Sequence, residues 1–372
     1  MKKTSVLMGL VGLVSIAGGL TSCGENGSNA EIAVVTDVGL LKDGGFNEGT
    51  YNGAVEFATA NKKTYQYYQP ANGANATDND RIAAMETAIK NKAKVIVAPG
   101  FLQAAAMTKV ASENPDVKFI FVDGWTLTDS NNKALNNVTA ITYKEQESGF
   151  LAGYAAVKEG YSKFGGCFGG GGSNPACNRF AYGYVQGINT AAKEENKNVE
   201  AKISYKYGDN FNASTELATQ MDGWYAGGTE IVFSCGGSMV NSVITAASKT
   251  EKGMVIGVDT DQASLSDRVL TSAQKGLAVS VKTVLTQTYN NEWDSKLGGK
   301  TQNLGAAEDA TGLPTKTESW RFKKFTVEAY NTIFNQIKTG AITPDSAVDE
   351  NCNVDAFWNK ATFTNVAVTL EK

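Results

Sequence analysis

Carboxylates and glycines stand directly after several short apolar runs of the sequence, and both residue types can serve a binding site. These positions are Asp37, Asp123, Gly236, Gly237, Asp259 and Asp261. Ionised carboxylates only accept hydrogen bonds, so they suit a neutral ligand that carries several hydroxyl or N–H groups. Phe46 and Asn47 stand in the loop after Asp37, and a phenylalanine on a polar loop offers a flat face on which a ring can stack. This combination favours a site for a neutral small molecule that is flat or rich in hydroxyl groups.

Each of these residues also has an ordinary structural explanation. An aspartate after a strand commonly caps a helix or forms a turn, and a glycine there permits a tight turn. Phe46 can instead pack on its own helix as a hydrophobic staple. We favour the site because several such strand ends would meet on one rim of a sheet, where open α/β sheets bind their ligands.

The composition excludes several classes of chemistry. The 372-residue chain has no histidine, which removes Ser-His and Cys-His nucleophile pairs, imidazole bases and histidine-ligated metals. A formal net charge of -4 gives no excess of Lys and Arg for binding the phosphates of nucleic acid. The glycine-rich run FGGGGSNP at 168–175 lacks the Lys-Ser/Thr ending of a phosphate-binding P-loop. We therefore expect no nucleic-acid partner, no cofactor and no metal, and a ligand without phosphate.

Short apolar runs alternate with helical patterns, which predicts repeated βαβ units with parallel strands buried on both faces. In the first series, strands are predicted at 32–36, 65–68, 95–98, 119–122 and 138–143, and helices near 46–60, 79–91 and 103–114. In the second series, helices are predicted at 145–157 and near 180–196, 213–226 and 239–249, and strands at 163–170, 202–207, 231–234 and 255–258. The predicted fold class is α/β, with two similar Rossmann-like lobes and a ligand cleft between them.

The N-terminus has the pattern of an export signal. A short cationic start, MKKTS, precedes the apolar run 6–20, which is too short to span a bilayer comfortably. The run ends in LTSC at 20–23, which resembles the bacterial lipobox. We expect residues 1–22 to be a signal peptide, Cys23 to carry lipid, and residues 23–30 to be a tether. An ordinary signal peptide with an incidental cysteine is the alternative.

Cys167 and Cys177 flank the glycine-rich run, which could close easily into a loop. In an exported chain this spacing makes a local disulfide possible. Two free buried thiols are the alternative, and the cysteine spacing matches no zinc motif.

Several motifs together resemble the basic membrane protein family of nucleoside-binding lipoproteins. In order, these are VTDVGLLKDGGFNEGTYNGA, VIVAPGFL, FIFVDG, YKEQESGFLAGYAA, RFAYGYVQGINTA, VIGVDTDQ and VLTSAQK. The likeness runs from about residue 31 to about residue 340. It implies a two-lobed type I periplasmic-binding fold that delivers a purine nucleoside to the permease and ATPase subunits of an ABC importer.

The resemblance also implies ligand-binding roles for individual residues. Asp37 and Asn47 would hydrogen-bond the base or its surroundings, and Phe46 would stack on it. Asp123 and Asp259 would hold polar groups of base and ribose, and Gly236 would let the backbone approach closely. Lys275 would reach the ribose hydroxyls, with Lys282 as the alternative lysine. Phe211 would complete the aromatic sandwich from the other lobe, with Tyr207 as its rival.

The implied domain organisation has two discontinuous lobes. Lobe 1 comprises residues 31–143 and about 260–310, and lobe 2 comprises residues 144–259 and about 311–345, while the placement of the tail 346–372 is left open. We expect a monomer held by its lipid on the outer face of the cell membrane.

Three other functions stay open from the sequence alone. A sugar or another polyol would also suit carboxylates and stacking rings. The DTD run at 259–261 resembles the metal-binding Asp-x-Asp of sugar-nucleotide transferases, and paired carboxylates can hydrolyse glycosides. A surface antigen or adhesin is the fourth possibility.

Overall fold

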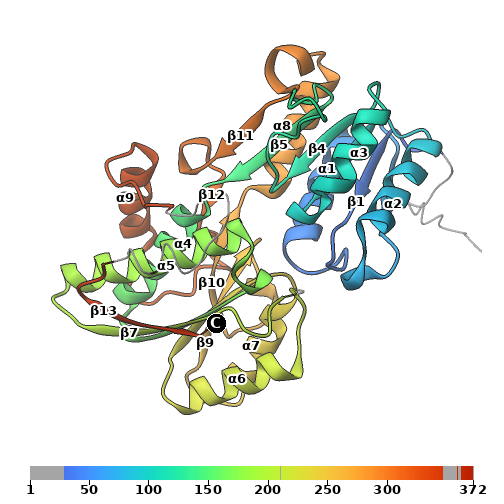
Figure 1. Cartoon of the computed structure of the whole chain (residues 1–372). Helices are drawn as coiled ribbons and strands as arrows, with labels where there is room; N and C mark the ends of the chain where they lie inside the picture. The colour runs from blue at the N-terminus through green and yellow to red at the C-terminus, as the bar shows by residue number, and fades with distance from the viewer. Residues whose placement is uncertain (1–28, 210, 347–357, 359–361, 372) are drawn as a thin grey trace, which may run out of the picture.

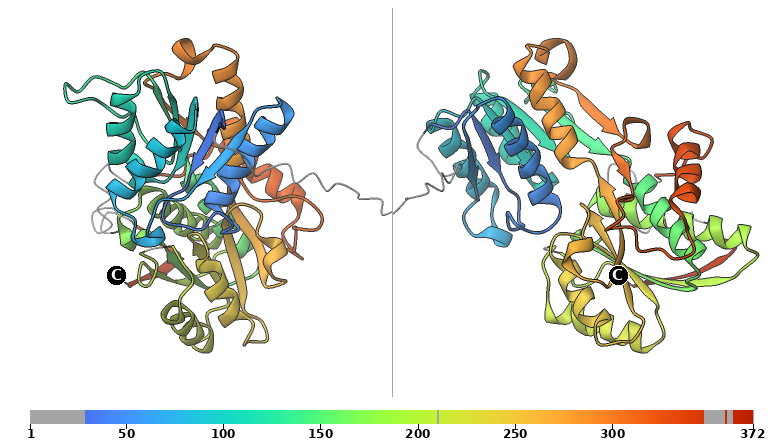
Figure 2. Two further views of the ribbon diagram at one scale, coloured as in Figure 1. Left: turned by 90° about the vertical axis from the view of Figure 1, so that its right-hand side faces the viewer. Right: turned by 180° about the vertical axis from the view of Figure 1, so that it is seen from behind.

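The computed structural model describes residues 29–209, 211–346, 358 and 362–371, and these form two lobes (Figure 1). Each lobe is a mostly parallel sheet with helices on both faces. Figure 2 shows lobe 1, in blue to teal, above lobe 2, in green to yellow, with chain segments that pass between them. The predicted α/β fold with two Rossmann-like lobes is confirmed. The proposed signal peptide, Cys23 and most of the tether lie outside the described residues.

The sheet of lobe 1 is entirely parallel, in the order β11-β5-β4-β3-β1-β2. Its strands are β1 (Ile32–Val35), β2 (Tyr65–Tyr68), β3 (Val95–Pro99), β4 (Lys118–Val122), β5 (Val138–Tyr143) and β11 (Thr301–Leu304). Helices α1 (Phe46–Ala60) and α8 (Leu277–Tyr289) cover one face, and α2 (Asp78–Lys90) and α3 (Ala104–Glu113) cover the other. The central strands are apolar throughout because both faces are covered.

The sheet of lobe 2 has the order β12-β10-β9-β8-β6-β7-β13, and within it β12 is antiparallel to β10. Its strands are β6 (Lys163–Phe168), β7 (Val199–Ser204), β8 (Ile231–Cys235), β9 (Met254–Asp259), β10 (Val269–Lys275), β12 (Thr311–Gly312) and β13 (Val366–Glu371). Helices α4 (Glu145–Glu159), α5 (Pro175–Glu194) and α9 (Val327–Lys338) pack on one face, and α6 (Thr215–Ala226) and α7 (Met239–Ala247) pack on the other.

Helices α4 and α5 touch backbone to backbone through paired glycines. A Cβ atom on Gly183 would lie 2.1 Å from the carbonyl oxygen of Gln146, and one on Gly187 would lie 2.0 Å from that of Phe150. On α4, a Cβ on Gly149 would meet the carbonyl oxygen of Phe180 at 2.3 Å. No side chain fits at these positions, so glycine sets the spacing of the helices that carry one wall of the cleft.

The chain crosses between the lobes after β5, after β10 and again between β11 and β12. Residues 260–275 were expected in lobe 1, but β10 pairs with β9 in the sheet of lobe 2. The return to lobe 1 therefore begins at Gly276. The tail, whose placement the sequence left open, contributes β13, which pairs with β7 at the edge of lobe 2.

The first turn of α4 ties the three crossings together. Glu147 Oε2 accepts hydrogen bonds from the Ala306 backbone N–H at 2.6 Å and from the Thr311 hydroxyl at 2.8 Å. Ser148 Oγ donates to the Gln274 carbonyl at 2.6 Å and accepts from the Gly312 N–H at 2.8 Å. Because these partners come from the second and third crossings, the segments at the hinge are held in one hydrogen-bonded group.

The lobes also meet at the mouth of the cleft. The carbonyl oxygen of Gly44 in lobe 1 accepts hydrogen bonds from Thr260 Oγ1 at 2.7 Å and from Gln262 Nε2 at 3.0 Å. Across the part of the chain that the structure describes, the helices are too short or too polar to cross a bilayer.

Candidate ligand-binding site

A single cavity between the lobes gathers all eight residues that the sequence nominated for ligand binding. It contains about 590 Å³ of space between protein atoms, part of it open to solvent. Its lining includes Asp37, Phe46, Asn47, Asp123, Phe211, Gly236, Asp259 and Lys275. These residues follow strands of both sheets, as expected for the carboxyl ends of parallel strands.

The wall from lobe 1 presents acceptor atoms. Asp43 accepts backbone N–H groups at the start of α1, and it accepts the Asn47 side-chain nitrogen at 3.3 Å. This contact leaves Asn47 Oδ1 buried without a hydrogen-bond partner among the described residues. Asp37 Oδ1 is also buried and also has no hydrogen-bond partner among them. The nearest cation to Asp37 is Arg81, whose Nη2 lies 3.7 Å away. Burial raises the pKa of Asp37 to about 6, although Arg81 partly opposes this.

Each lobe contributes one phenylalanine to the cavity. Phe46 is the first residue of α1 and is half-buried. Phe211 has a positive φ of 61°, and its ring lies against glycines: a Cβ on Gly169 would come within 2.4 Å of it and one on Gly236 within 3.0 Å. Glycines therefore form the slot that holds this ring.

Of the two alternative residues that the sequence left open, neither lines the cavity. Tyr207 is 49% exposed and is not among the residues that line the cavity. Lys282 lies on the outer side of α8, where its Nζ is 3.6 Å from Glu56. The structure therefore brings Phe211 and Lys275 to the cavity in place of these rivals.

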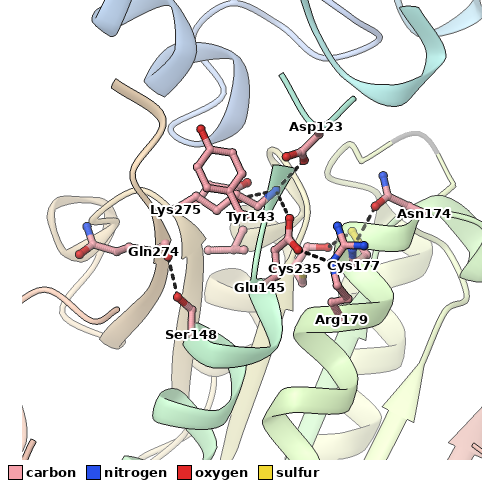
Figure 3. Close-up of polar contacts among 12 residues, drawn as sticks. Asp123, Tyr143, Glu145, Ser148, Asn174, Cys177, Arg179, Cys235, Gln274 and Lys275 are labelled. Carbon is pink, nitrogen blue, oxygen red and sulfur yellow. Dashed lines mark hydrogen bonds and ion pairs between the residues drawn. The ribbon is translucent and has the colours of Figure 1, made fainter. Parts of the chain in front are cut away.

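Lys275, which lines the cavity, is held by three carboxylates, and Figure 3 shows its contacts with Asp123 and Glu145. Its Nζ lies 2.6 Å from Asp123, 3.3 Å from Glu145 and 3.8 Å from Asp259. Arg179 Nε, on α5, contacts the other oxygen of Glu145 at 2.5 Å. The ammonium group is thus surrounded by fixed negative charge, and Asp123 Oδ1 still lacks a hydrogen-bond partner among the described residues.

Burial and ion pairing shift the pKa values of this cluster in opposite directions. Burial raises the pKa of Asp259 to about 7 and raises that of Asp123, although Lys275 opposes both shifts. Burial works against the charged form of Glu145 as well, but Arg179 and Lys275 outweigh it, so the pKa of Glu145 is lowered. The three carboxylates hold the pKa of Lys275 well above its ordinary value despite its burial. Lys275 is therefore a permanent cation that orients Asp123 and Asp259.

Comparison with known proteins assigns this architecture to a family. A family model described as ABC transporter substrate-binding protein PnrA-like matches residues 30–342. The chain belongs to this family, the Bmp family. The resemblance seen in the sequence motifs is therefore confirmed, and the family is one of solute-binding proteins, not of enzymes.

Relatives of the Bmp family cover most of the chain. The ABC transporter nucleoside-binding protein BmpA of Lactococcus lactis is 28% identical over 322 residues, 79% of this chain and 87% of the relative. Basic membrane protein A of Borreliella burgdorferi is 30% identical over 314 residues, 78% of this chain and 82% of the relative. A solved ABC transporter solute-binding protein from Aeropyrum pernix shares the fold, with a TM-score of 0.65, 21% identity and coverage of 90% of this chain and 93% of that one.

Of the two states that the sequence left open for Cys167 and Cys177, a local disulfide or two free buried thiols, the structure shows the free thiols. Both are free thiols, because Cys167 on β6 packs against the α6 and α7 face of the sheet, whereas Cys177 on α5 lies on the opposite face. Cys177 instead donates weakly to the carbonyl oxygen of Cys235 at 3.9 Å, and both of these cysteines line the cavity. Among the described residues, no three Cys, Asp or Glu side chains gather as a metal site.

Sequence reasoning missed several residues of the site, notably Glu145, Arg179 and Asn174. Glu145 lies two residues after the end of β5, so the rule that selected Asp123 and Asp259 would also have selected it. Asn174 precedes Pro175 at the start of α5, which is the signature of a helix N-cap. No local signal marked Arg179, because its partner Glu145 lies on another helix.

Proposed function

We propose that this chain is a lipid-anchored receptor that captures a purine nucleoside between its lobes and delivers it to an ABC importer. One observation carries the proposal: Phe46 from lobe 1 and Phe211 from lobe 2 line the same cavity, together with buried acceptor atoms that have no described hydrogen-bond partner. The name of the Lactococcus lactis relative, a nucleoside-binding protein, supports the same ligand class.

The chemistry of the walls is complementary to a nucleoside. A purine offers two flat faces for stacking between the phenylalanines. Its N–H groups can donate to Asp37 Oδ1 and Asn47 Oδ1, and the ribose hydroxyls can donate to Asp123 and Asp259. The carboxylates that surround Lys275 would repel a phosphate group, so the uncharged nucleoside fits better than a nucleotide.

The anchor and the partners follow from the N-terminal pattern and from family membership. Lipid on Cys23 would hold the receptor on the outer face of the cell membrane, and the permease and ATPase subunits of an importer would receive the ligand. We propose that the receptor works as a monomer, because the cavity is assembled from the two lobes of one chain.

Calorimetry on the mature chain, purified in detergent, tests the proposal. Adenosine, guanosine or inosine should bind with micromolar affinity or tighter, about -8 kcal/mol or better. Phe46→Ala should weaken binding by about 1 to 3 kcal/mol, since one stacking face is lost. Tyr207→Ala removes an aromatic ring outside the cavity and should leave affinity unchanged.

Two outcomes would refute the proposal. Binding of free sugars without any binding of nucleosides would make the chain a sugar receptor. If chromatography detected free base released from a nucleoside by the chain, the chain would be an enzyme.

A further inference from the structure

The side chain of Asn174 is held in one orientation. It caps helix α5, and its Oδ1 accepts the backbone N–H of Cys177 at 3.0 Å. A backbone N–H can only donate, so the atom that faces it must be the amide oxygen. The Nδ2 group is therefore directed away from the helix, as Figure 3 shows.

Asn174 stands at the edge of the Phe211 ring. A Cβ on Gly170 would lie 2.6 Å from Asn174 Cβ and 3.3 Å from Phe211 Cζ, so both side chains press against the same glycine. Gly170, Gly171 and Gly172 all have positive φ, of 78°, 57° and 82°, which brings this loop close to the start of α5. A flat group that stacks on Phe211 would thus have an edge within reach of Nδ2.

Three other side chains of the cavity offer the opposite polarity. Asp37 Oδ1, Asn47 Oδ1 and Asp123 Oδ1 are buried acceptors without a described hydrogen-bond partner, although Arg81 Nη2 lies 3.7 Å from Asp37 Oδ1. Lys275 is a donor, but it is engaged by three carboxylates. Asn174 Nδ2, which also has no partner among the described residues, therefore gives the cavity a neutral donor on the wall of lobe 2.

We propose that Asn174 is a specificity-determining residue of this receptor. Its Nδ2 donates a hydrogen bond to an acceptor atom, a ring nitrogen or a carbonyl oxygen, on the edge of the base that stacks on Phe211. This inference rests on the proposed nucleoside function. It means that lobe 1 reads the donors of the base and lobe 2 reads an acceptor of the base, so a base must present both when the lobes close.

Two substitutions separate this role from the capping role. Asn174→Ser keeps a good N-cap but is too short to reach the ligand, and Asn174→Asp keeps the shape but replaces the donor with an acceptor. In the full mature chain in detergent, both variants should keep the wild-type melting temperature. Asn174→Ser should weaken binding of the tightest-bound nucleoside about tenfold, and Asn174→Asp should weaken it further. Asn241→Ser on α7, outside the cavity, is the control and should bind as wild type does.

Analogues of the ligand identify the contacted atom. The 3-deaza and 7-deaza forms of that nucleoside each lack one ring-nitrogen acceptor, and for a 6-oxo nucleoside such as inosine, purine riboside lacks the carbonyl acceptor. One of them should bind the wild-type chain about tenfold more weakly and should not be weakened further by Asn174→Ser.

Several results would overturn the inference. Binding of the parent nucleoside to Asn174→Ser within twofold of wild type would overturn it and leave the proposed function standing. Equal sensitivity of every analogue to Asn174→Ser would place the contact elsewhere than on the base and would also overturn it. Absence of nucleoside binding by the wild-type chain would overturn the proposed function and this inference together.

Discussion

Gly183→Ala should test whether the contact of α4 with α5 sets the geometry of lobe 2. The added Cβ would lie 2.1 Å from the carbonyl oxygen of Gln146 and 2.6 Å from Gln146 Cα. A comfortable contact needs about 3.5 Å, so the helices would have to move apart by roughly 1.4 Å. Both obstructing atoms belong to backbone, and a side-chain rotation cannot relieve the clash. We expect a loss of about 3 kcal/mol in the free energy of unfolding, at the upper end for overpacking.

Urea unfolding followed by fluorescence and circular dichroism provides the measurement. The chain supplies a matched control in Gly223, an exposed glycine within α6 where an added Cβ would meet nothing within 4 Å. Gly223→Ala should stabilise the protein by up to about 1 kcal/mol, because alanine is the better helix former. The two alanine substitutions should thus have opposite signs. Equal effects would show that the helices can separate freely and would refute the packing argument.

Three further predictions concern charge and the hinge. Lys275→Gln should lower the free energy of unfolding by about 3 to 5 kcal/mol at pH 7.5, because buried carboxylates lose their cation. The loss should be smaller at pH 5, where the carboxylates take up protons. Urea unfolding at both pH values measures the difference. Burial raises the folded pKa of Asp37 to about 6 and that of Asp259 to about 7. The folded chain therefore binds more protons than the unfolded chain above pH 4, so stability without ligand should fall as pH rises from about 4 to 7, and Asp37→Asn should flatten that slope. Glu147→Ala should cost about 2 kcal/mol in urea unfolding because it leaves hinge donors unpaired, and an unchanged unfolding midpoint would contradict that reasoning.

The rule that ligands bind at the carboxyl ends of strands located most of the site from sequence. Asp123 and Asp259 could be selected because each follows an unmistakable apolar run, and their strands lie in different lobes. This rule works because the parallel strands of each sheet have their carboxyl ends at the same edge of the sheet. The two edges face each other across the cleft.

Other features could not be predicted because they depend on contacts between distant segments. Strand β10 was missed since it buries Thr271 and Ser272, so it does not look like an apolar run. The pairing of Glu145 with Lys275 joins residues that lie far apart in sequence. Cys167 and Cys177 are near in sequence, yet a sheet separates them.

The interleaving of the two lobes constrains the order in which the chain can fold. Translation proceeds from the N-terminus, and strand β11, which completes the first sheet at its edge, is synthesised only after β6 to β10 of the second sheet. Strand β13 closes the far edge of the second sheet and lies at the last residues described. Neither lobe can mature while the ribosome is still making the other, so truncating the chain before residue 301 should leave both halves with an exposed edge that is prone to aggregate.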